Sequence, residues 1–347
     1  LRYFPVLAGD MDALNSIIGP KIWNLANNAD NKISRLAISV LQSINPDKAK
    51  LDQVSDLILD ENQRSDLRKE WLRLLRKWDL NLFTSVGTQV LYSKSPELRA
   101  VAAEELTEAD LGGSAVDNYL LETFNNSSDT VELQRAIKMI PRLKSKKYII
   151  GKLFKELIDG RIAPEIQLEV LEEARTISRD YLDIRMLMDN YNNFINKQDV
   201  MTRYKVALKG GNAEKGKDLF FGHAQAQCSK CHALKQIDRQ IGPSLEGIAK
   251  RHSREFLLQS MVDPQAEITL GYGIVSVKLN DDQIVNGTLI SREENRISIK
   301  LPDNSLEYFL TSEIKSLSKP VGTMPDLKSI LNLRQVRDLV AYLATFN

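Results

Sequence analysis

The segment Cys228-Ser229-Lys230-Cys231-His232 places two thiols three residues apart and an imidazole directly after the second thiol. It contains both cysteines of the 347-residue chain and one of its three histidines. At this spacing two thiols can bond one edge of a haem, and the histidine that follows can ligate the iron from one face. We therefore expect one covalently bound haem c, attached through Cys228 and Cys231 and ligated by His232.

The same motif has two other possible interpretations. A redox-active dithiol usually lies in a strand-to-helix context, whereas residues 212–226, which precede the motif, have a helical pattern. A structural zinc site needs about four ligands, and the sequence has no second cysteine pair. The haem interpretation is favoured, and thiol redox chemistry and a metal site stay as its alternatives.

An electron-carrying haem also needs a ligand on its second face, commonly methionine or histidine. Met324 is the favoured candidate, because it lies in a loop before the last amphipathic helix and is followed by Pro325, which stiffens the backbone. The alternative for Met324 is a plain core residue. Met261, His223 and His252 are further candidates for the second ligand; Met261 fits a helix core better, and His252 lies in a basic run typical of a solvated face.

From residue 216 onward the order of these parts is similar to that of class I c-type cytochromes. Residues 216–220 precede the motif, Gly242-Pro243 follows it, and Met324-Pro325 precedes a closing helix over 338–343. The resemblance implies that the Pro243 carbonyl accepts a hydrogen bond from the Nδ1–H of His232 and so orients the imidazole. It also implies that the helix containing Gly216 closely crosses the helix containing Tyr342.

The interval between His232 and Met324 is longer than a compact cytochrome of this class needs, which predicts an insertion. Within it the periodicity changes from helical to alternating. Strands are predicted at 274–279, 283–290, 296–301 and 306–310, with a short last segment at 313–317. The sequence thus predicts a small antiparallel β-barrel or a sheet curled over a helix, inserted at 271–318.

Residues 206–347 resemble a haem-binding domain of planctomycete and verrucomicrobial proteins. The resemblance rests on the cytochrome motif followed by residues 253–258, Asp263-Pro264 and Gly271-Tyr272, the alternating segment and Met324-Pro325. In that family the domain commonly ends a long secreted chain that includes helical repeats and a propeller resembling sugar dehydrogenases. The present sequence contains no propeller.

Residues 1–205 consist of long helical stretches with little glycine. Amphipathic helices open around polar positions 35, 68, 99, 134 and 167, which are 31 to 35 residues apart. Periods in this range indicate stacked helix pairs, because a single pair cannot bury its apolar face alone. The sequence therefore predicts a mostly α protein, with a HEAT-like α-solenoid (1–205) before the haem domain (206–347). The solenoid is expected to bind partners or to act as a spacer.

Charge and hydropathy limit the classes of partner. The chain has 47 basic and 46 acidic residues, a formal net charge of +1, so no global field favours nucleic acid or an anionic membrane. No stretch approaches the roughly twenty apolar residues of a membrane span. The sequence begins with neither methionine nor a secretory signal, and we expect a processed or truncated piece.

The resulting prediction is a c-type cytochrome that carries single electrons between redox partner proteins, as a subunit or C-terminal part of a larger assembly. Haem attachment in such proteins implies a periplasmic or outer-surface location, with any signal sequence removed or upstream. No motif for catalysis by this chain alone is present. Two alternatives stay open: the electron-accepting tail of a sugar or alcohol dehydrogenase, and a scaffold subunit of a surface complex with an auxiliary haem.

Overall fold

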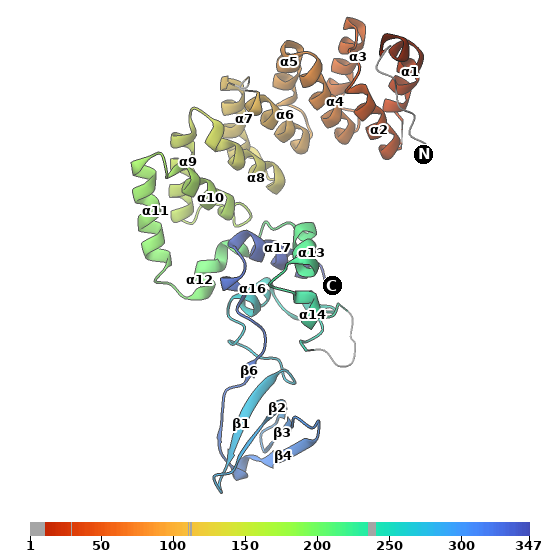
Figure 1. Ribbon diagram of the computed structural model, residues 1–347. Coiled ribbons are helices and arrows are strands. Elements are labelled where there is room, and N and C mark those ends of the chain that lie inside the picture. The colour runs from red at the N-terminus through yellow and green to blue at the C-terminus, as the bar shows by residue number, and fades with distance from the viewer. Residues whose placement is uncertain (1–10, 29, 110, 112, 235–240) are drawn as a thin grey trace. The chain divides into compact units, whose positions relative to one another are not determined.

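The computed structural model describes residues 11–28, 30–109, 111, 113–234 and 241–347. The chain divides into two compact units, one ending at Lys152 and the other beginning at Leu153. Most elements are helices, and one antiparallel sheet lies in the C-terminal part, as Figure 1 shows. The mostly α fold expected from the sequence is confirmed. The predicted domain limits, 1–205 and 206–347, stay predictions.

The first unit is built from consecutive helices joined by short turns. Their bounds are α1 (Met11–Ala26), α2 (Asn31–Leu41), α3 (Lys48–Leu59), α4 (Ser65–Trp78), α5 (Leu80–Val90), α6 (Pro96–Glu108), α7 (Gly113–Asn126) and α8 (Thr130–Met139), followed by α9 (Lys146–Ile158), in which the unit ends. Helices predicted around residues 35, 68, 99 and 134 are present as α2, α4, α6 and α8. Because α4 contacts both α2 and α6, successive pairs bury their apolar faces against each other. The solenoid class itself stays a prediction.

Acidic and hydroxyl side chains explain where several of these helices begin. Asp47, Asp79, Ser95 and Asp129 each precede a helix and accept a hydrogen bond from a backbone N–H of its first turn. Such caps satisfy donors that have no partner within the helix. The turns at Asp47 and Ser95 coincide with the Asn-Pro and Ser-Pro sequences that punctuate the helical pattern.

Ion pairs connect helices that are one repeat apart. Arg99 of α6 donates two hydrogen bonds to the buried Glu132 of α8, at 2.8 and 2.7 Å. The hydroxyl of Tyr119 also reaches Glu132, at 3.0 Å. A buried carboxylate needs partners of this kind. Arg99, one of the regularly spaced polar residues of the sequence, therefore connects α6 to α8.

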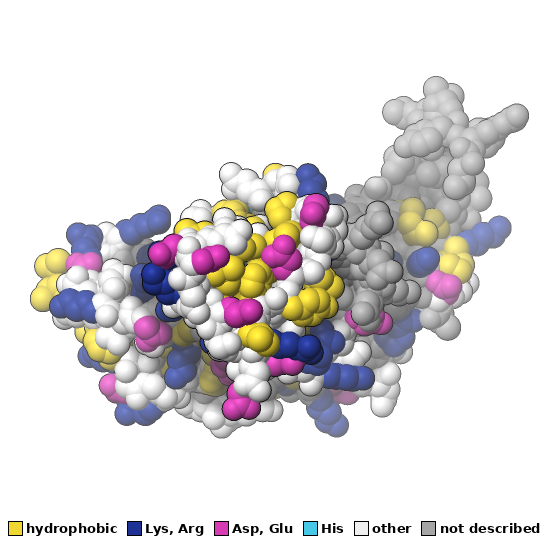
Figure 2. Space-filling view, turned by 90° about the horizontal axis from the view of Figure 1, so that it is seen from below, with side chains coloured by type: hydrophobic (Ala, Val, Ile, Leu, Met, Phe, Trp, Pro, Cys, Tyr) yellow, Lys and Arg dark blue, Asp and Glu magenta, His cyan; other side chains and the backbone are white. Residues whose placement is uncertain are grey.

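The second unit contains the remaining helices and the sheet. Its helices are α10 (Gln167–Ile177), α11 (Leu182–Ile195), α12 (Val200–Tyr204), α13 (Ala213–Gly222), α14 (Cys228–Cys231), α15 (Ile248–Arg251), α16 (Arg254–Val262) and α17 (Leu333–Leu343). The predicted helix around residue 167 is present as α10. Among the described residues, no helix is long and apolar enough to cross a membrane. Basic and acidic side chains are interspersed over the face shown in Figure 2.

Helices α13 and α17 cross at Gly216, as the cytochrome resemblance implies. A Cβ at this position would collide with the backbone carbonyl of Asp338 and would lie 2.7 Å from Cβ of Tyr342. The ring centroids of Phe220 and Tyr342 are 5.7 Å apart across the same crossing. The glycine therefore allows two backbones to meet and brings two aromatic rings into one apolar cluster.

A buried ion pair joins α10 to α17. Arg337 is 2% exposed and donates two hydrogen bonds to the fully buried Glu169, at 2.8 and 2.7 Å. Arg334 adds a third bond to Glu169, at 3.0 Å. Burial alone raises the pKa of the Glu169 carboxyl, but the hydrogen bonds and charges of Arg337 and Arg334 hold that pKa below its usual value. Helix α10 is thus connected to the closing helix by charged groups inside the core.

The sheet contains six antiparallel strands. They are β1 (Gly273–Leu279), β2 (Ile284–Arg292), β3 (Arg296–Lys300), β4 (Leu306–Leu310), β5 (Ile314–Leu317) and β6 (Val321–Gly322). The order is β4-β3-β2-β1-β5, and β6 pairs with the start of β1. The first five match the predicted segments, whereas β6 was not predicted. Because β6 pairs with β1, the residues that follow the predicted insertion lie beside its first strand.

The form of the sheet corrects part of the prediction. Its apolar cluster contains residues of the strands and their turns, with no helix in it, so the sheet folds over its own apolar face. Among the described strands the two edges, β4 and β5, do not pair with each other. The sheet is therefore neither a closed barrel nor a sheet curled over a helix. Two of its ladders, β1–β5 and β2–β3, contain a bulge.

Candidate functional site

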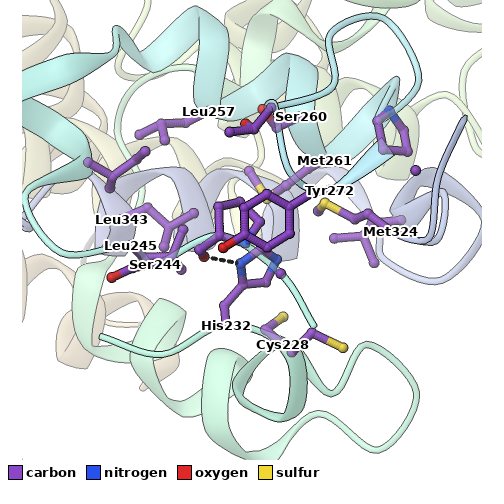
Figure 3. A pocket seen from close by; sticks show the side chains of 18 of the residues that line it. Cys228, His232, Ser244, Leu245, Leu257, Ser260, Met261, Tyr272, Met324 and Leu343 are labelled. Atoms are coloured by element: carbon purple, nitrogen blue, oxygen red, sulfur yellow. Dashed lines mark hydrogen bonds between the residues drawn. The ribbon is translucent and has the colours of Figure 1, made fainter. Parts of the chain in front are cut away.

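The two cysteines of the motif lie at the ends of a single helical turn. Cys228 begins α14 and Cys231 ends it, so the two side chains are three positions apart on a helix and lie on one face. The backbone N–H of His232 donates to the carbonyl of Cys228 at 2.9 Å, and His232 itself has extended backbone angles. The chain thus leaves the helix at the histidine. Figure 3 shows the His232 ring among the side chains that line the cavity.

The orientation of His232 is fixed by the returning loop. Its Nδ1 lies 2.9 Å from the backbone carbonyl of Pro243, which is the hydrogen bond that the cytochrome resemblance implies. A carbonyl only accepts, so Nδ1 carries the proton and Nε2 is left with its lone pair. The loop is anchored by Gly242, whose N–H donates to the carbonyl of Cys231 at 3.0 Å. This is the arrangement by which proteins orient a metal-ligating imidazole.

A cavity of about 250 Å³ adjoins the motif. It is lined by Cys228, Cys231, His232 and Met324, which are the residues predicted from the sequence to attach or ligate the haem. Apolar side chains from several elements form much of the remaining wall; among them are Phe220, Leu245, Leu257, Leu339 and Leu343. The predicted insertion does not separate Met324 from the motif, because the loop after β6 returns it to the same cavity.

The other candidates for the second ligand have different positions. Met261 of α16 is 3% exposed and lines the cavity from inside the core. His252 also lines the cavity, with its ring stacked on Phe256 at 3.7 Å between centroids. His223 lines a separate shallow pocket, and its Nδ1 accepts a hydrogen bond from the N–H of Ala226 at 3.2 Å. Met324 remains our candidate, because its partly buried side chain lies on a loop at the cavity.

Sequence reasoning missed several cavity residues. Tyr272, Ile268 and Ser260 line the wall, and the basic run, which is expected to be solvated, also contributes Arg251 to the rim of the cavity. Arg251 is exposed and donates to the carbonyl of Glu246 at 2.5 Å. The Gly271-Tyr272 pair is one of the motifs that carry the family resemblance, but nothing in the sequence around it indicates that the tyrosine side chain faces a cavity.

The residues present fit a covalently bound haem. Two thiols share one helix face, one imidazole has a free Nε2, and a thioether lies on the same largely apolar cavity. Burial raises the pKa of the Cys228 thiol, whereas a redox-active dithiol depends on a lowered one. Among the described residues, no group of three or more His, Cys, Asp or Glu side chains is arranged to hold a metal ion.

One relative supports part of this interpretation. The chain is 40% identical over 60 residues to a protein named cytochrome c-553-like from Synechocystis sp.. The match covers 17% of this chain and 51% of that protein, so the chain spans about half the length of the curated relative it matches. No family model matches the chain. The similarity shows a cytochrome c-like region, and the helical-repeat resemblance stays a prediction.

Proposed function

We propose that this chain is a c-type cytochrome that binds one haem through Cys228 and Cys231 and transfers single electrons. The observation that carries the proposal is the meeting of both cysteines, His232 and Met324 at one cavity. A bound haem iron would supply a one-electron couple between its ferric and ferrous states.

The side chains have distinct roles in this proposal. Cys228 and Cys231 would attach the cofactor, and His232 would ligate the iron through Nε2 while the carbonyl of Pro243 holds its ring. Met324 would supply the second ligand, and a thioether ligand raises the reduction potential. The apolar wall would keep water away from a bound haem, and an apolar surrounding favours the oxidation state with less charge.

An electron carrier needs a donor and an acceptor. We place the protein in the periplasm or on the outer surface of a bacterium, since c-type haem is attached outside the cytoplasm. A dehydrogenase or another redox protein would deliver one electron to the ferric iron, and a second carrier would remove it. The helices of residues 1–205 are proposed to attach the haem region to a larger assembly.

The test is a mass and absorption measurement on the purified native protein. The intact mass should exceed that of the polypeptide by one haem, and a pyridine haemochrome spectrum should report one c-type haem per chain. In Cys231→Ala one thioether is lost, so the haemochrome maximum shifts away from the position given by double attachment. A native chain with the mass of the bare polypeptide would contradict the proposal.

A further inference from the structure

The strand β6 leads directly into the loop that contains Met324. Gly322 is the last residue of β6, and only Thr323 separates it from the methionine. β6 is held in the sheet by pairing with β1, with Gly273 opposite Gly322 and Ile274 opposite Val321. The inserted sheet therefore borders the loop on its N-terminal side.

A single side chain fixes the same residue from outside the sheet. The amide of Gln265 accepts a hydrogen bond from the N–H of Gly322 at 3.0 Å and donates one to its carbonyl at 3.2 Å. One primary amide thus satisfies both backbone groups of the residue, as a neighbouring strand would do. Gln265 follows α16 by three residues, so it links the helical cavity wall to the loop.

Ile268 adds an apolar contact at this junction. A Cβ on Gly273 would lie 2.7 Å from Cγ2 of Ile268, and one on Gly322 would lie 2.8 Å from its Cδ1. The isoleucine side chain therefore lies against both glycines of the β1–β6 pair, and it also lines the cavity. Larger residues at 273 or 322 would separate the sheet from residues 265–268.

The far end of the loop is also attached to α16. The Nζ of Lys328 donates to the carbonyl of Val262 at 3.3 Å. Residues 322–328, including Met324, are thus held at both ends by contacts with residues 262–265. Every group in these contacts lies outside the set of proposed haem ligands.

From these contacts we infer that Gln265 is a positioning residue that, with the β1–β6 pair, holds the Met324 thioether at the cavity. The inference rests on the proposed function and gives the inserted sheet a role in it. A methionine is a weak, neutral ligand whose bond to iron depends on the loop that presents it. Freeing Gly322 loosens the loop without removing any ligand.

The experiment compares Gln265→Ala with Gln283→Ala in the haem-loaded full chain. Gln283 is an exposed glutamine in the turn between β1 and β2 and serves as the matched control. The first readout is the near-infrared charge-transfer band of methionine ligation in the oxidised protein. The second is the dissociation constant of imidazole, which competes with the thioether for the iron.

We expect Gln265→Ala to bind imidazole about thirtyfold more tightly than the unmodified chain, because two hydrogen bonds of ordinary strength correspond to roughly that factor. Its near-infrared band should weaken, while Gln283→Ala keeps both properties. Gln265→Glu, which retains an acceptor but loses the donor when ionised, should lie between them. This nearly isosteric variant serves if the alanine variant folds poorly.

Three outcomes separate this inference from the function on which it rests. Equal imidazole constants for Gln265→Ala and Gln283→Ala would overturn the positioning role while leaving the cytochrome intact. A near-infrared band that survives Met324→Ala would overturn the role by removing the ligand it positions. A chain without covalent haem would overturn the proposed function itself.

Discussion

At the scale of single residues, the His232 ring is held by a hydrogen bond and by a contact that a glycine permits. The Pro243 carbonyl fixes the direction of Nδ1, at 2.9 Å. Gly242 lies against the ring, and a Cβ there would be 2.8 Å from Cε1 and 3.0 Å from Nδ1. Real Cβ atoms do not approach ring atoms so closely, so any larger residue must displace the imidazole.

This argument predicts the effect of Gly242→Ala. The added methyl group should push His232 out of line with Pro243 and weaken its bond to iron, while both thioethers still form. The visible spectrum of the oxidised protein should then show a partial change from low-spin to high-spin iron. Gly222→Ala is the control, because a Cβ on Gly222 meets nothing within 4 Å. An unchanged Gly242→Ala spectrum would show that the ring has room to adjust.

At the scale of elements, the crossing of α13 and α17 depends on Gly216. A methyl group there meets the backbone carbonyl of Asp338, which cannot rotate away as a side chain could. We expect Gly216→Ala to lower the free energy of unfolding by about 2 kcal/mol, within the range usual for overpacking. Denaturant unfolding measures this, and Gly222→Ala on the same helix should change it by much less. Helix propensity alone would make both alanine variants more stable, so a Gly216→Ala variant that is no less stable than Gly222→Ala would contradict the close-crossing argument.

The Glu169–Arg337 pair makes a second prediction at this scale. Glu169→Gln leaves Arg337 buried without its counter-charge, and breaking such a pair costs about 3 kcal/mol. Glu293→Gln is the matched control, because Glu293 pairs with Arg296 where both side chains are 54% exposed. That loss should stay below about 1 kcal/mol. Denaturant unfolding measures the loss of stability in both variants. Equal losses would mean that the buried pair contributes no more to stability than the exposed one.

The same carboxylate predicts a pH dependence of stability. The pKa of Glu169 in the folded chain lies below its ordinary value of 4.5. Its contribution to stability is therefore complete above about pH 4.5 and is lost as the pH falls from there through the folded pKa. Unfolding measured from pH 7 down to the acid limit should show a shallower decline in Glu169→Gln than in the unmodified chain. If the free energy of unfolding falls equally with pH in both proteins, carboxylates other than Glu169 cause the loss of stability in acid.

At the scale of the whole molecule, patterns among residues close together in the sequence predicted most helices and strands, and the cytochrome resemblance predicted some of their contacts. The 31- to 35-residue spacing located α2, α4, α6, α8 and α10, and alternation located β1 to β5, because both patterns are carried by neighbours in the chain. Gly216 and Pro243 were placed through the cytochrome resemblance. The sequence could not reveal that Glu169 meets Arg337, since that contact joins segments far apart in the chain.

The two-residue strand β6 and the role of Gln265 were beyond sequence reasoning for a related reason. A strand of two residues has no periodicity to detect, and an exposed glutamine has no pattern that indicates a backbone partner at residue 322. The open form of the sheet was likewise missed, because alternation shows which face is apolar but not whether the edge strands pair.

The last prediction concerns the sheet as a whole. Residues 273–317 form most of it. Ser318 lies beside Ser276, the fourth residue of β1, so a short Gly/Ser linker can join Tyr272 to Ser318. The motif, the His232–Pro243 bond and the α13–α17 crossing all lie outside the deleted residues. We therefore expect the shortened chain to retain covalent haem, as measured by intact mass.

Because β1 no longer supports β6 in the shortened chain, the near-infrared methionine band of that chain should be weaker than the band of Gln265→Ala. Loss of haem attachment would instead show that the sheet belongs to the fold of the haem region and is not an insertion into it.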